Sequence, residues 1–506
     1  MLISSECPAP SLSTAIRLSK SKFLSGLQCY KRLYLEIHAP ELATQPDAAT
    51  KAILAMGTEI GELARQRLSG GVLVDINYRH TAEALKRTQE LVNDPHVPAI
   101  FEGAFIHEQV LIRVDILERV CAEDGSVSWR LIEVKSSTRV KEVHIDDLAV
   151  QAYVLAGAGI QLVETCLMHI NTQYVYDGKT LDLAQLFAVH DLSDHVTARQ
   201  TKVITRLAEM KAMLALPVPP DVEPSSHCQS PYECSFWDSC TKEKPARWIF
   251  HLPGGAQTFQ SLVKLGVTSI DDIPAGFPLS INQRRMRDNV EWVSAGLKST
   301  LETVAYPVHH LDFETFMPAI PKFPRTRPYQ TIPTQWSNHI EFGNGDMRHD
   351  EYLCLDPKDP REELAAALLE SLGEKGSICV YSGYERAILE RLADLLPGLR
   401  ADLQRVIGRL WDLFPVIRDH YYHPAFEGSY SIKSVLPAVV PSLSYGDLEI
   451  QEGAMAAQVY YQMVFDEMDL MEKARMKEAL MRYCGRDTLA MVELRRALYH
   501  KVIAGC

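Results

Sequence analysis

Hydrophobic and polar residues alternate with two different periods in the first 200 residues of the chain. Apolar positions recur at helical spacing over 51–68 and over 144–160, where the run ends in glycine. β-Branched and apolar residues alternate with polar ones, as in the strands of a sheet, over 99–120, 129–137 and 164–176. The pattern predicts an α/β unit.

A second α/β pattern begins at about residue 304, after a stretch of short helical patterns. Three consecutive strands come first and strand and helix alternation follows, an order compatible with a ribonuclease-H-like sheet. The predicted strands are 306–316, 334–342, 351–357 and 377–383, and the predicted helices are 361–373 and 384–396. We therefore expect an N-terminal α/β domain at 1–243, a helical connector at 244–303 and a C-terminal α/β domain at 304–506.

Length and composition are typical of a multidomain globular protein. A chain of 506 residues exceeds what one hydrophobic core usually organises, and 46% hydrophobic with 23% charged residues is ordinary. No apolar run approaches the roughly 20 residues that span a bilayer, and residues 1–23 lack the continuous apolar stretch of a secretion signal. We expect a cytoplasmic protein without a membrane segment, in which thiols stay reduced.

The formal net charge of −13 bears on nucleic-acid binding. It argues against a protein that coats nucleic acid nonspecifically, but a nuclease carries metal-binding carboxylates and can still line a local channel with Arg and Lys. Each basic cluster could equally be a solvated face. The candidates are Arg17, Lys20, Lys22, Lys31, Arg32, Arg284, Arg285, Arg287, Lys322, Arg325 and Arg327.

Asp115, Glu133 and Lys135 form the first candidate for catalysis. Asp115 lies in LIRVDIL, and Glu133 and Lys135 lie two residues apart in LIEVKSS, so the latter two point to the same face of a strand. Two carboxylates beside a lysine can hold Mg²⁺ or Mn²⁺ while the ammonium positions a water and stabilises charge on a phosphate. A surface ion pair is the alternative, because E-x-K is common in strands.

This arrangement resembles the PD-(D/E)XK nucleases, and specifically the RecB-like exonucleases that include the CRISPR-associated ones. The acidic motif of that family matches Asp115, its E-x-K matches Glu133 and Lys135, and the glutamine of its following helix matches Gln151. The resemblance implies a restriction-endonuclease-like fold in the N-terminal domain and a metal-dependent nuclease site built from these four residues.

Two positions depart from the family pattern. The tyrosine of the glutamine motif is usually four residues after the glutamine, whereas here Tyr153 follows Gln151 by two. The histidine of the early helix is missing from GTEIGEL, which offers Gly61 or Glu62 in its place. We expect metal binding to differ in detail, with Glu102 as a candidate extra carboxylate.

Three cysteines, Cys228, Cys234 and Cys240, lie close together in HCQSPYECSFWDSC. Eleven cysteines in a cytosolic chain argue against disulfides and make a tight cluster a candidate metal site. In the iron-sulfur members of the RecB-like family, one cysteine precedes the nuclease core and three follow it, which implies that Cys29 is the fourth ligand of a 4Fe-4S cluster. Such a cluster would tie the two ends of the domain together. Zinc with His227, or buried thiols clustered by chance, are the alternatives.

The second candidate site combines HHLDFETF with MRYCGRDTLAMVELRRAL. Asp312 and Glu314 are two residues apart on a predicted strand, and Tyr483 is four residues before Asp487 on a predicted helix, so each pair shares a face. D-x-E followed by Y-x3-D resembles the DEDD exonucleases, the group of ribonuclease D and polymerase proofreading domains, in its tyrosine subclass. The resemblance implies that the acids bind two divalent ions and that the tyrosine orients the attacking water. Surface acids are the alternative.

Glu385 matches the middle acid of the DEDD pattern, where the family has an aspartate. We expect the longer side chain to shift or weaken one metal. Asp412, in RLWDLFPVI, is the alternative middle acid. The interval from Glu385 to Asp487 is longer than in minimal members, which implies an inserted segment around 423–445.

The two resemblances together cover most of the chain, in an order that resembles a bacterial family pairing an iron-sulfur RecB-like nuclease with a DEDD-like 3′-5′ exonuclease. They imply hydrolysis of DNA that depends on Mg²⁺ or Mn²⁺, from single-stranded ends, at two active sites. An RNA exonuclease that uses mainly the C-terminal site is one alternative. A nucleic-acid-binding scaffold with degenerate sites is the other.

Overall fold

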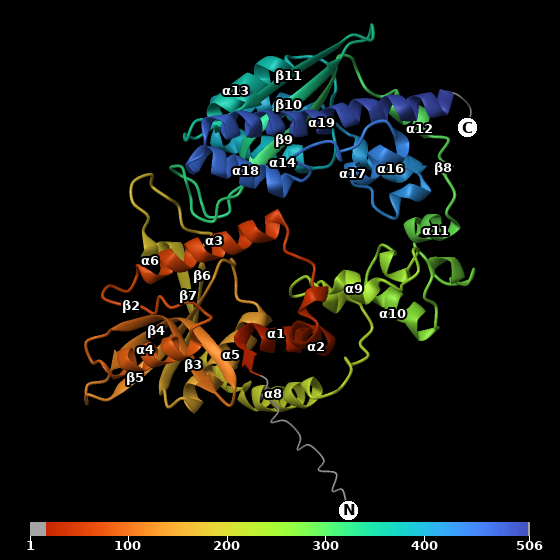
Figure 1. The fold of residues 1–506 in the computed structure, drawn as a ribbon. Helices are drawn as coiled ribbons and strands as arrows, with labels where there is room; N and C mark the ends of the chain where they lie inside the picture. The colour runs from red at the N-terminus through yellow and green to blue at the C-terminus, as the bar shows by residue number, and fades with distance from the viewer. Residues whose placement is uncertain (1–16, 504–506) are drawn as a thin grey trace, which may run out of the picture. The chain divides into compact units, whose positions relative to one another are not determined.

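The computed structural model describes residues 17–503, which form two units, each described by itself below. The first unit contains the chain up to Tyr174 and Thr180–Lys242, and the second contains Val175–Lys179 and the chain from Glu243 onward (Figure 1). Each unit combines helices with one main sheet, so the α/β class expected from the sequence is confirmed. The expected helical connector, 244–303, belongs to the second unit.

Two expectations about the cellular location have different outcomes. In the described part of the chain, no helix is long and apolar enough to cross a membrane. The expectation that the chain lacks a secretion signal rests largely on residues 1–16, which lie outside the described residues.

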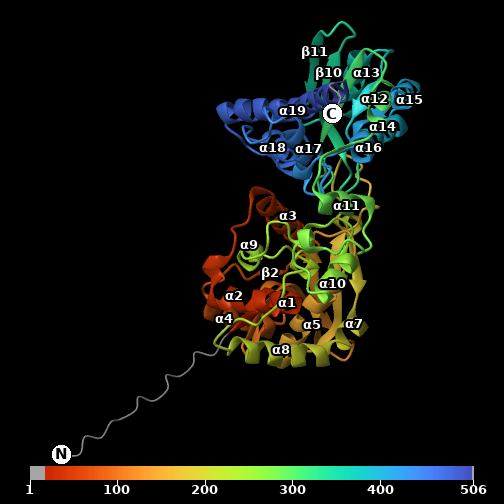
Figure 2. The same cartoon turned by 90° about the vertical axis from the view of Figure 1, so that its right-hand side faces the viewer.

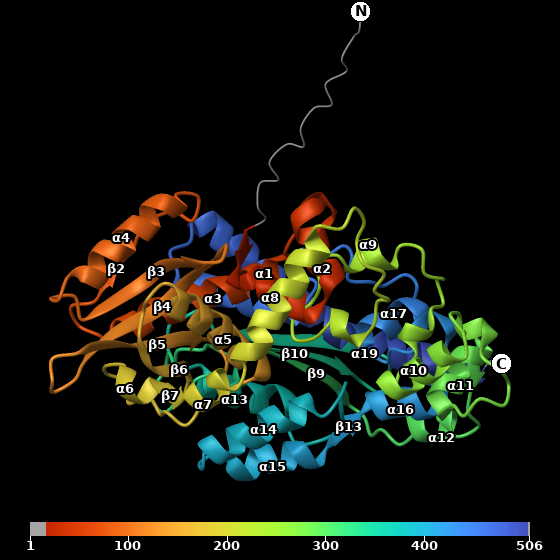
Figure 3. The same cartoon turned by 90° about the horizontal axis from the view of Figure 1, so that it is seen from below.

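The first unit is built on a seven-stranded sheet in the order β2-β3-β4-β5-β6-β7, with β1 beside β4. Strands β3, β4 and β5 are antiparallel and run side by side (Figure 3), whereas β6 is parallel to β5 and follows the crossover helix α5. The strands are β1 (Leu18–Ser19), β2 (Val72–Leu73), β3 (Ala99–His107), β4 (Val110–Cys121), β5 (Val127–Lys135), β6 (Leu162–Ile170) and β7 (Phe187–Asp191). The helices are α1 (Lys20–Gln28), α2 (Tyr30–His38), α3 (Ala48–Arg65), α4 (Thr81–Asn93), α5 (Glu142–Gly157), α6 (Leu183–Leu186), α7 (Ser193–Thr197), α8 (Gln200–Leu214) and α9 (Trp237–Thr241).

The predicted strand 99–120 is two strands in the structure. Glu108 and Gln109 adopt φ angles of 43° and 66° and form the tight turn between β3 and β4. Positive φ at both central residues is the conformation of a type I′ hairpin turn, whose twist matches that of the flanking strands. The sequence hides this turn because neither residue is the glycine or asparagine that usually marks it.

The second unit is built on a five-stranded sheet in the order β11-β10-β9-β12-β13. Strands β9, β10 and β11 are antiparallel, and β12 and β13 continue the sheet in parallel with β9. Its strands are β9 (Val308–Phe316), β10 (Ile332–Glu341), β11 (Met347–Leu353), β12 (Ile378–Val380) and β13 (Leu410–Asp412). A separate two-stranded sheet pairs β8 (Trp292–Val293) with β14 (Tyr421–Tyr422). The helices are α10 (Ala256–Lys264), α11 (Ile281–Asp288), α12 (Leu297–Leu301), α13 (Arg361–Leu372), α14 (Tyr384–Leu395), α15 (Arg400–Gly408), α16 (Leu413–His420), α17 (Ile432–Val439), α18 (Gly453–Phe465) and α19 (Leu470–Ile503).

Helices cover both faces of this second sheet (Figure 2). Leu311 and Phe313 of β9 join the core beneath α13, α14 and α15, while Val308 and Phe316 join the core that includes α18 and α19. Because side chains alternate between the faces of a strand, the even-numbered residues of β9 face α18 and α19.

Polar contacts fix α19 against β10. The hydroxyls of Ser337 and Thr488 are 2.8 Å apart, and Gln335 Nε2 donates to the Leu480 carbonyl at 3.0 Å. The buried guanidinium of Arg495 pairs with Glu341. These contacts set the register of the helix that carries Tyr483 and Asp487 relative to the sheet.

Candidate functional site

Three neighbouring strands bring Glu102, Asp115 and Glu133 together in the first unit. The register of β3 with β4 sets Glu102 beside Asp115, and continuing the register of β4 with β5 sets Asp115 beside Glu133. Glu102 has a φ of 55°, a conformation that is uncommon for a non-glycine residue and is frequent at functional sites. All three carboxylates, with Lys135, line a cavity of about 350 Å³.

Both carboxylate oxygens of Glu133 are engaged. Lys20 Nζ lies 2.9 Å from Oε1 and 3.0 Å from Oε2, and Lys135 Nζ lies 2.5 Å from Oε1. Gln151 Nε2 donates to Oε2 at 2.7 Å. The Glu133 carboxylate is therefore held by two ammonium groups and one amide.

Asp147 on α5 is a second buried acid of this site. It accepts from Lys135 Nζ at 2.8 Å and from Gln151 Nε2 at 2.9 Å. Gln151 is fully buried, and its Oε1 has no hydrogen-bond partner in the described structure. Asp115 differs from Asp147 in that its Oδ2 accepts from the backbone N–H of Val134 at 2.7 Å, which orients the carboxylate along the strand edge.

The acids of this site have opposite protonation tendencies. Burial and the neighbouring Glu133 carboxylate raise the pKa of Asp115 to about 7. Burial and Glu133 also raise the pKa of Asp147. Burial alone would raise the pKa of Glu133, but the ammonium groups of Lys135 and Lys20 hold it well below its usual value. Glu133 is thus ionised. A cation bound near Asp115 would lower the pKa of Asp115 and stabilise its ionised form.

All four residues expected at the first site, Asp115, Glu133, Lys135 and Gln151, are brought together. The sequence did not reveal that Asp147 belongs to the site, although it lies one helical turn before Gln151. Lys20 was expected only as a general basic candidate. Tyr153 lies outside the cavity, where its hydroxyl donates to Glu108 at 2.8 Å.

The four cysteines expected to form a cluster come from both ends of the first unit. Cys29 lies between α1 and α2, and Cys228, Cys234 and Cys240 lie on the segment that follows α8. Burial raises the pKa of Cys234, and the nearby Cys29 and Cys240 raise it further. The two segments are also joined by Gln28, whose Nε2 donates to the His227 and Tyr232 carbonyls at 2.8 and 2.6 Å.

In the described structure, no three of these four cysteines have their sulfur atoms within 4.8 Å of one another. Among residues 17–503, the only three Cys, His, Asp or Glu ligand atoms that lie within 4.8 Å of one another belong to Asp312, Glu314 and Cys484. A single tetrahedral zinc ion with Zn–S distances of about 2.3 Å holds its sulfurs about 3.8 Å apart. Three of the four thiols would therefore have to move closer together to hold one zinc ion.

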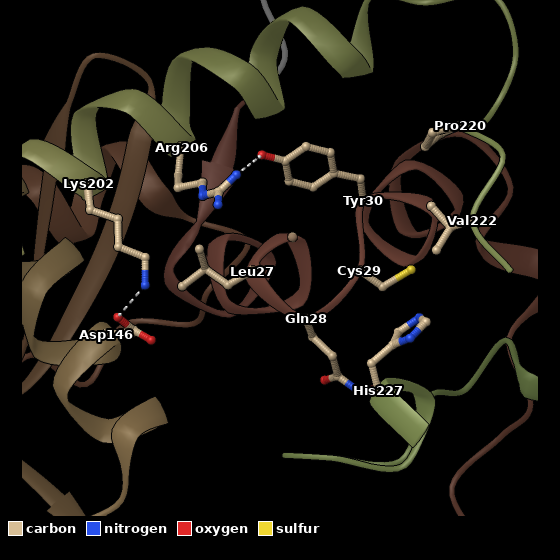
Figure 4. A pocket seen from close by; sticks show the side chains of 11 residues that line it. Leu27, Gln28, Cys29, Tyr30, Asp146, Lys202, Arg206, Pro220, Val222 and His227 are labelled. Atoms are coloured by element: carbon tan, nitrogen blue, oxygen red, sulfur yellow. Dashed lines mark hydrogen bonds and ion pairs between the residues drawn. The ribbon is translucent and has the colours of Figure 1, made fainter. Parts of the chain in front are cut away.

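His227 lies beside these thiols, with its Nε2 3.5 Å from Cys228 Sγ and its Nδ1 2.6 Å from Ser225 Oγ. Figure 4 shows His227 and Cys29 lining the same pocket, of about 410 Å³. Burial lowers the pKa of His227, which keeps its imidazole neutral. The short contact with Ser225 occupies one ring nitrogen and leaves Nε2 as the one directed at sulfur.

The second unit brings a separate set of acids together. Asp312 and Glu314 lie on the face of β9 that is covered by α18 and α19, Glu385 lies in the first turn of α14, and Asp487 lies on α19. Cys484 Sγ is 3.7 Å from Asp312 Oδ2. The ligand atoms of Asp312, Glu314 and Cys484 form the group described above that could hold one metal ion.

These four carboxylates destabilise one another's charge. Burial and the charges of Asp487 and Glu314 raise the pKa of Asp312 well above its usual value, and burial with Asp487 does the same for Glu314. Burial raises the pKa of Glu385 to about 8 and that of Asp487 to about 6. Glu385 Oε2 is buried and has no hydrogen-bond partner in the described structure. A divalent cation would relieve this repulsion and satisfy the unpaired oxygen.

The segment expected as an insertion, 423–445, contributes to this site. Tyr445 donates its hydroxyl proton to Asp487 Oδ1 at 2.5 Å. Lys433 Nζ lies 5.5 Å from the centre of the Tyr445 ring and 5.3 Å from that of Tyr483. Its charge opposes the rise in the pKa of Asp487. Nothing in the sequence identified Lys433 and Tyr445, whereas Cys484 could have been found because it lies one helical turn before Asp487.

Asp412, the alternative middle acid, uses one carboxylate oxygen to cap a helix. Its Oδ1 accepts from the backbone N–H groups of Ser382 at 3.0 Å and Phe414 at 2.9 Å, and so caps the N-terminus of α16. Besides burial, its charge also raises the pKa of Glu385, so the two acids lie close together, and both stay candidates for the middle acid.

Several candidate basic residues make contacts within the second unit. Arg285 stacks on Trp292, with Cζ 3.8 Å from the ring centre, and donates to the Arg418 carbonyl. Arg287 pairs with Asp288 at 2.8 Å, and Lys322 Nζ lies 4.9 Å from the centre of the Tyr461 ring. These contacts are those of structural cations, in contrast to Lys20, which lies in the first site.

The C-terminal site overlaps the region of the chain that is similar to a known family. Residues 309–431 match a domain of unknown function, DUF2779. This range contains Asp312, Glu314 and Glu385 and ends before Tyr483 and Asp487.

Two further similarities are weaker. The chain is 24% identical over 206 residues to "Uncharacterized protein MG366 homolog" of Mycoplasma pneumoniae, an alignment that covers 37% of this chain and 31% of that protein. The chain thus matches about a third of the length of this relative. The crystal structure of SSO0001 aligns with 46% of this chain and 90% of its own at 15% identity and a TM-score of 0.20.

Proposed function

We propose that this protein is a divalent-metal-dependent nuclease that hydrolyses DNA from single-stranded ends and has one active site in each unit. The observation that carries the proposal is that Asp115, Glu133 and Lys135 line one cavity, with the buried Gln151 hydrogen-bonded to Glu133 behind its wall. These residues come from two strands and a helix that are separated along the chain. Two acids and a lysine in such a cavity are the chemical minimum for metal-assisted attack of water on a phosphodiester.

The strand orders support the fold families in this proposal. In the first unit, antiparallel β3, β4 and β5 followed by α5 and a parallel β6 are compatible with a restriction-endonuclease-like domain. In the second unit, three antiparallel strands followed by two parallel ones are compatible with a ribonuclease-H-like domain. Fold alone does not assign activity, so the side chains of each site are what support catalysis.

In the first site, Asp115 and Glu133 would hold the metal ion, with Glu102 within reach of the same cavity. Lys135 keeps its ammonium between Glu133 and Asp147, where it can orient a water and stabilise negative charge on a phosphate. The side-chain amide of Gln151 donates hydrogen bonds to Glu133 and Asp147 and so holds both carboxylates in place. The ion itself would supply Lewis-acid stabilisation and lower the pKa of a bound water.

In the second site, Asp312, Glu314, Glu385 and Asp487 would hold the metal ions. Their mutual repulsion and the unpaired oxygen of Glu385 support a site built for a cation. Tyr483, one helical turn before Asp487, would orient the attacking water. Tyr445 fixes the Asp487 carboxylate through its hydrogen bond to Oδ1.

Cys29, Cys228, Cys234 and Cys240 would hold a 4Fe-4S cluster that ties the start of the first unit to its end. Thiolates are the usual ligands of such clusters. This assignment requires reduced thiols, so a cytoplasmic location is part of the proposal.

We expect anaerobically purified protein to be brown and to contain about four iron and four sulfide per chain. Cys29→Ala should remove the colour and destabilise the first unit, because metal binding is coupled to folding. The control is Cys121→Ala, at an exposed cysteine of the same unit. Colourless wild-type protein with stoichiometric zinc would contradict the iron-sulfur assignment.

The choice of DNA over RNA is tested by incubating the purified protein with labelled single-stranded and double-stranded DNA and RNA in Mg²⁺ or Mn²⁺. The proposal predicts that single-stranded DNA is shortened fastest and that chelation of the metal stops the reaction. Faster shortening of RNA, dependent on Asp312 rather than Lys135, would indicate an RNA exonuclease that uses the C-terminal site.

A further inference from the structure

Lys20 lies inside the first candidate site although it belongs to a distant part of the chain. It is the first residue of α1, directly after β1, whose Ser19 pairs with Leu111 of β4. The Lys20 side chain is 22% exposed and lines the same cavity as Asp115 and Glu133. The pairing of β1 with β4 holds the backbone of Lys20, so its ammonium can move by side-chain rotation alone.

The ammonium of Lys20 occupies the oxygens that a metal ion would need. It lies 2.9 and 3.0 Å from the two oxygens of Glu133, so it spans the carboxylate as a bound cation does. A divalent ion and an ammonium repel each other strongly at such separations in a half-buried cavity. Ion binding at Glu133 therefore requires one of the two lysines to leave.

The contacts of the two lysines show which one leaves. Lys135 also donates to Asp147 Oδ2 at 2.8 Å. Asp147 therefore still holds Lys135 in the site after an ion has taken its place at Glu133. Lys20 reaches Asp147 Oδ1 only at 3.6 Å, and its short contacts in the cavity are all to Glu133. Lys20 is thus the lysine with the longer contact to Asp147 and the one held mainly by Glu133.

We propose that Lys20 is a positioning residue that holds the Glu133 carboxylate in the ion-free protein and is displaced when a divalent cation binds. The inference rests on the proposed metal site at Asp115 and Glu133. Lys20 keeps the Glu133 carboxylate in place, and its charge sets the ion concentration at which the site fills. Once displaced, the ammonium remains at the wall of the cavity.

The test is the affinity of the full-length protein for Mn²⁺, measured from the electron paramagnetic resonance signal of the free ion. The Asp115→Asn variant shows which bound Mn²⁺ belongs to this site, because the ions bound there should be lost from that variant. These ions are the Asp115-dependent class. In the same class, Lys20→Met, which keeps the length of the side chain and removes its charge, should bind Mn²⁺ about tenfold or more tightly than the wild type. Lys22→Met, two residues along α1, should leave the affinity unchanged.

Unchanged or weaker Mn²⁺ binding by Lys20→Met would overturn the proposal and make Lys20 a structural ion pair. If Lys20→Met does not fold, Lys20→Gln retains a donor to Glu133 without the charge and should also bind more tightly. The measurement is independent of cleavage. A wild-type protein that binds Mn²⁺ in the Asp115-dependent class but cleaves no substrate would contradict the proposed function and leave the displacement of Lys20 intact.

Discussion

Lys135→Ala should lower DNA cleavage by the N-terminal site about a thousandfold or more. Its ammonium lies between Glu133 and Asp147, where the proposed reaction would develop negative charge on a phosphate. Losing a group that stabilises such charge costs several kcal/mol of transition-state stabilisation. Each 1.36 kcal/mol is tenfold in rate. The measurement is the initial rate on labelled single-stranded DNA in Mg²⁺, with the C-terminal site silenced by Asp312→Asn.

The matched control for this variant is Lys86→Met on α4, an exposed lysine of the same unit. It should cleave at the wild-type rate. Iron content and thermal stability of Lys135→Ala should stay close to wild type, since Lys20 still pairs with Glu133. An unchanged cleavage rate would reduce Asp115, Glu133 and Lys135 to a structural cluster of ion pairs.

The second large effect concerns the C-terminal site. Lys135→Ala protein should retain a metal-dependent 3′-5′ exonuclease activity, and adding Asp312→Asn or Asp487→Asn should lower that activity about a thousandfold or more. Both acids lie in the group that a cation would neutralise. Tyr483→Phe should be milder, because the tyrosine orients water and holds no metal.

Glu385 affects how this second experiment is designed. A glutamate where an aspartate is usual changes the reach of one ligand, so the activity should be assayed in Mn²⁺ as well as Mg²⁺, since Mg²⁺ demands near-ideal octahedral geometry. The control is Asp394→Asn, because the Asp394 side chain on α14 is largely exposed. This variant should leave the exonuclease rate unchanged. No shortening from the 3′ end in either metal would mean that the C-terminal unit is a binding module.

The sequence predicts those pairs of site residues whose spacing matches the repeat of a strand or of a helix. Glu133 and Lys135 share a strand face, as do Asp312 and Glu314, because side chains alternate along a strand. Tyr483 and Asp487 share a helix face for the corresponding reason. These pairs are local in the chain, so their relative placement needs no knowledge of the tertiary fold.

The residues that the sequence did not place depend on tertiary contacts. Lys20 reaches Glu133 across 113 positions and Tyr445 reaches Asp487 across 42, and no periodic pattern encodes such distances. The helix cap that Asp412 Oδ1 provides is likewise set by the fold around α16. The β3–β4 turn was missed because Glu108 and Gln109 adopt positive φ without the usual turn residues.

The central claim, metal-dependent cleavage at two sites, is tested most directly with 5′-labelled single-stranded DNA in Mn²⁺, comparing wild-type protein with the double variant Lys135→Ala, Asp312→Asn purified in parallel. We predict that the wild type shortens the DNA, that a chelator stops it, and that the double variant leaves the DNA intact while remaining folded. Equal shortening by the double variant, or no shortening by the wild type, would contradict the account.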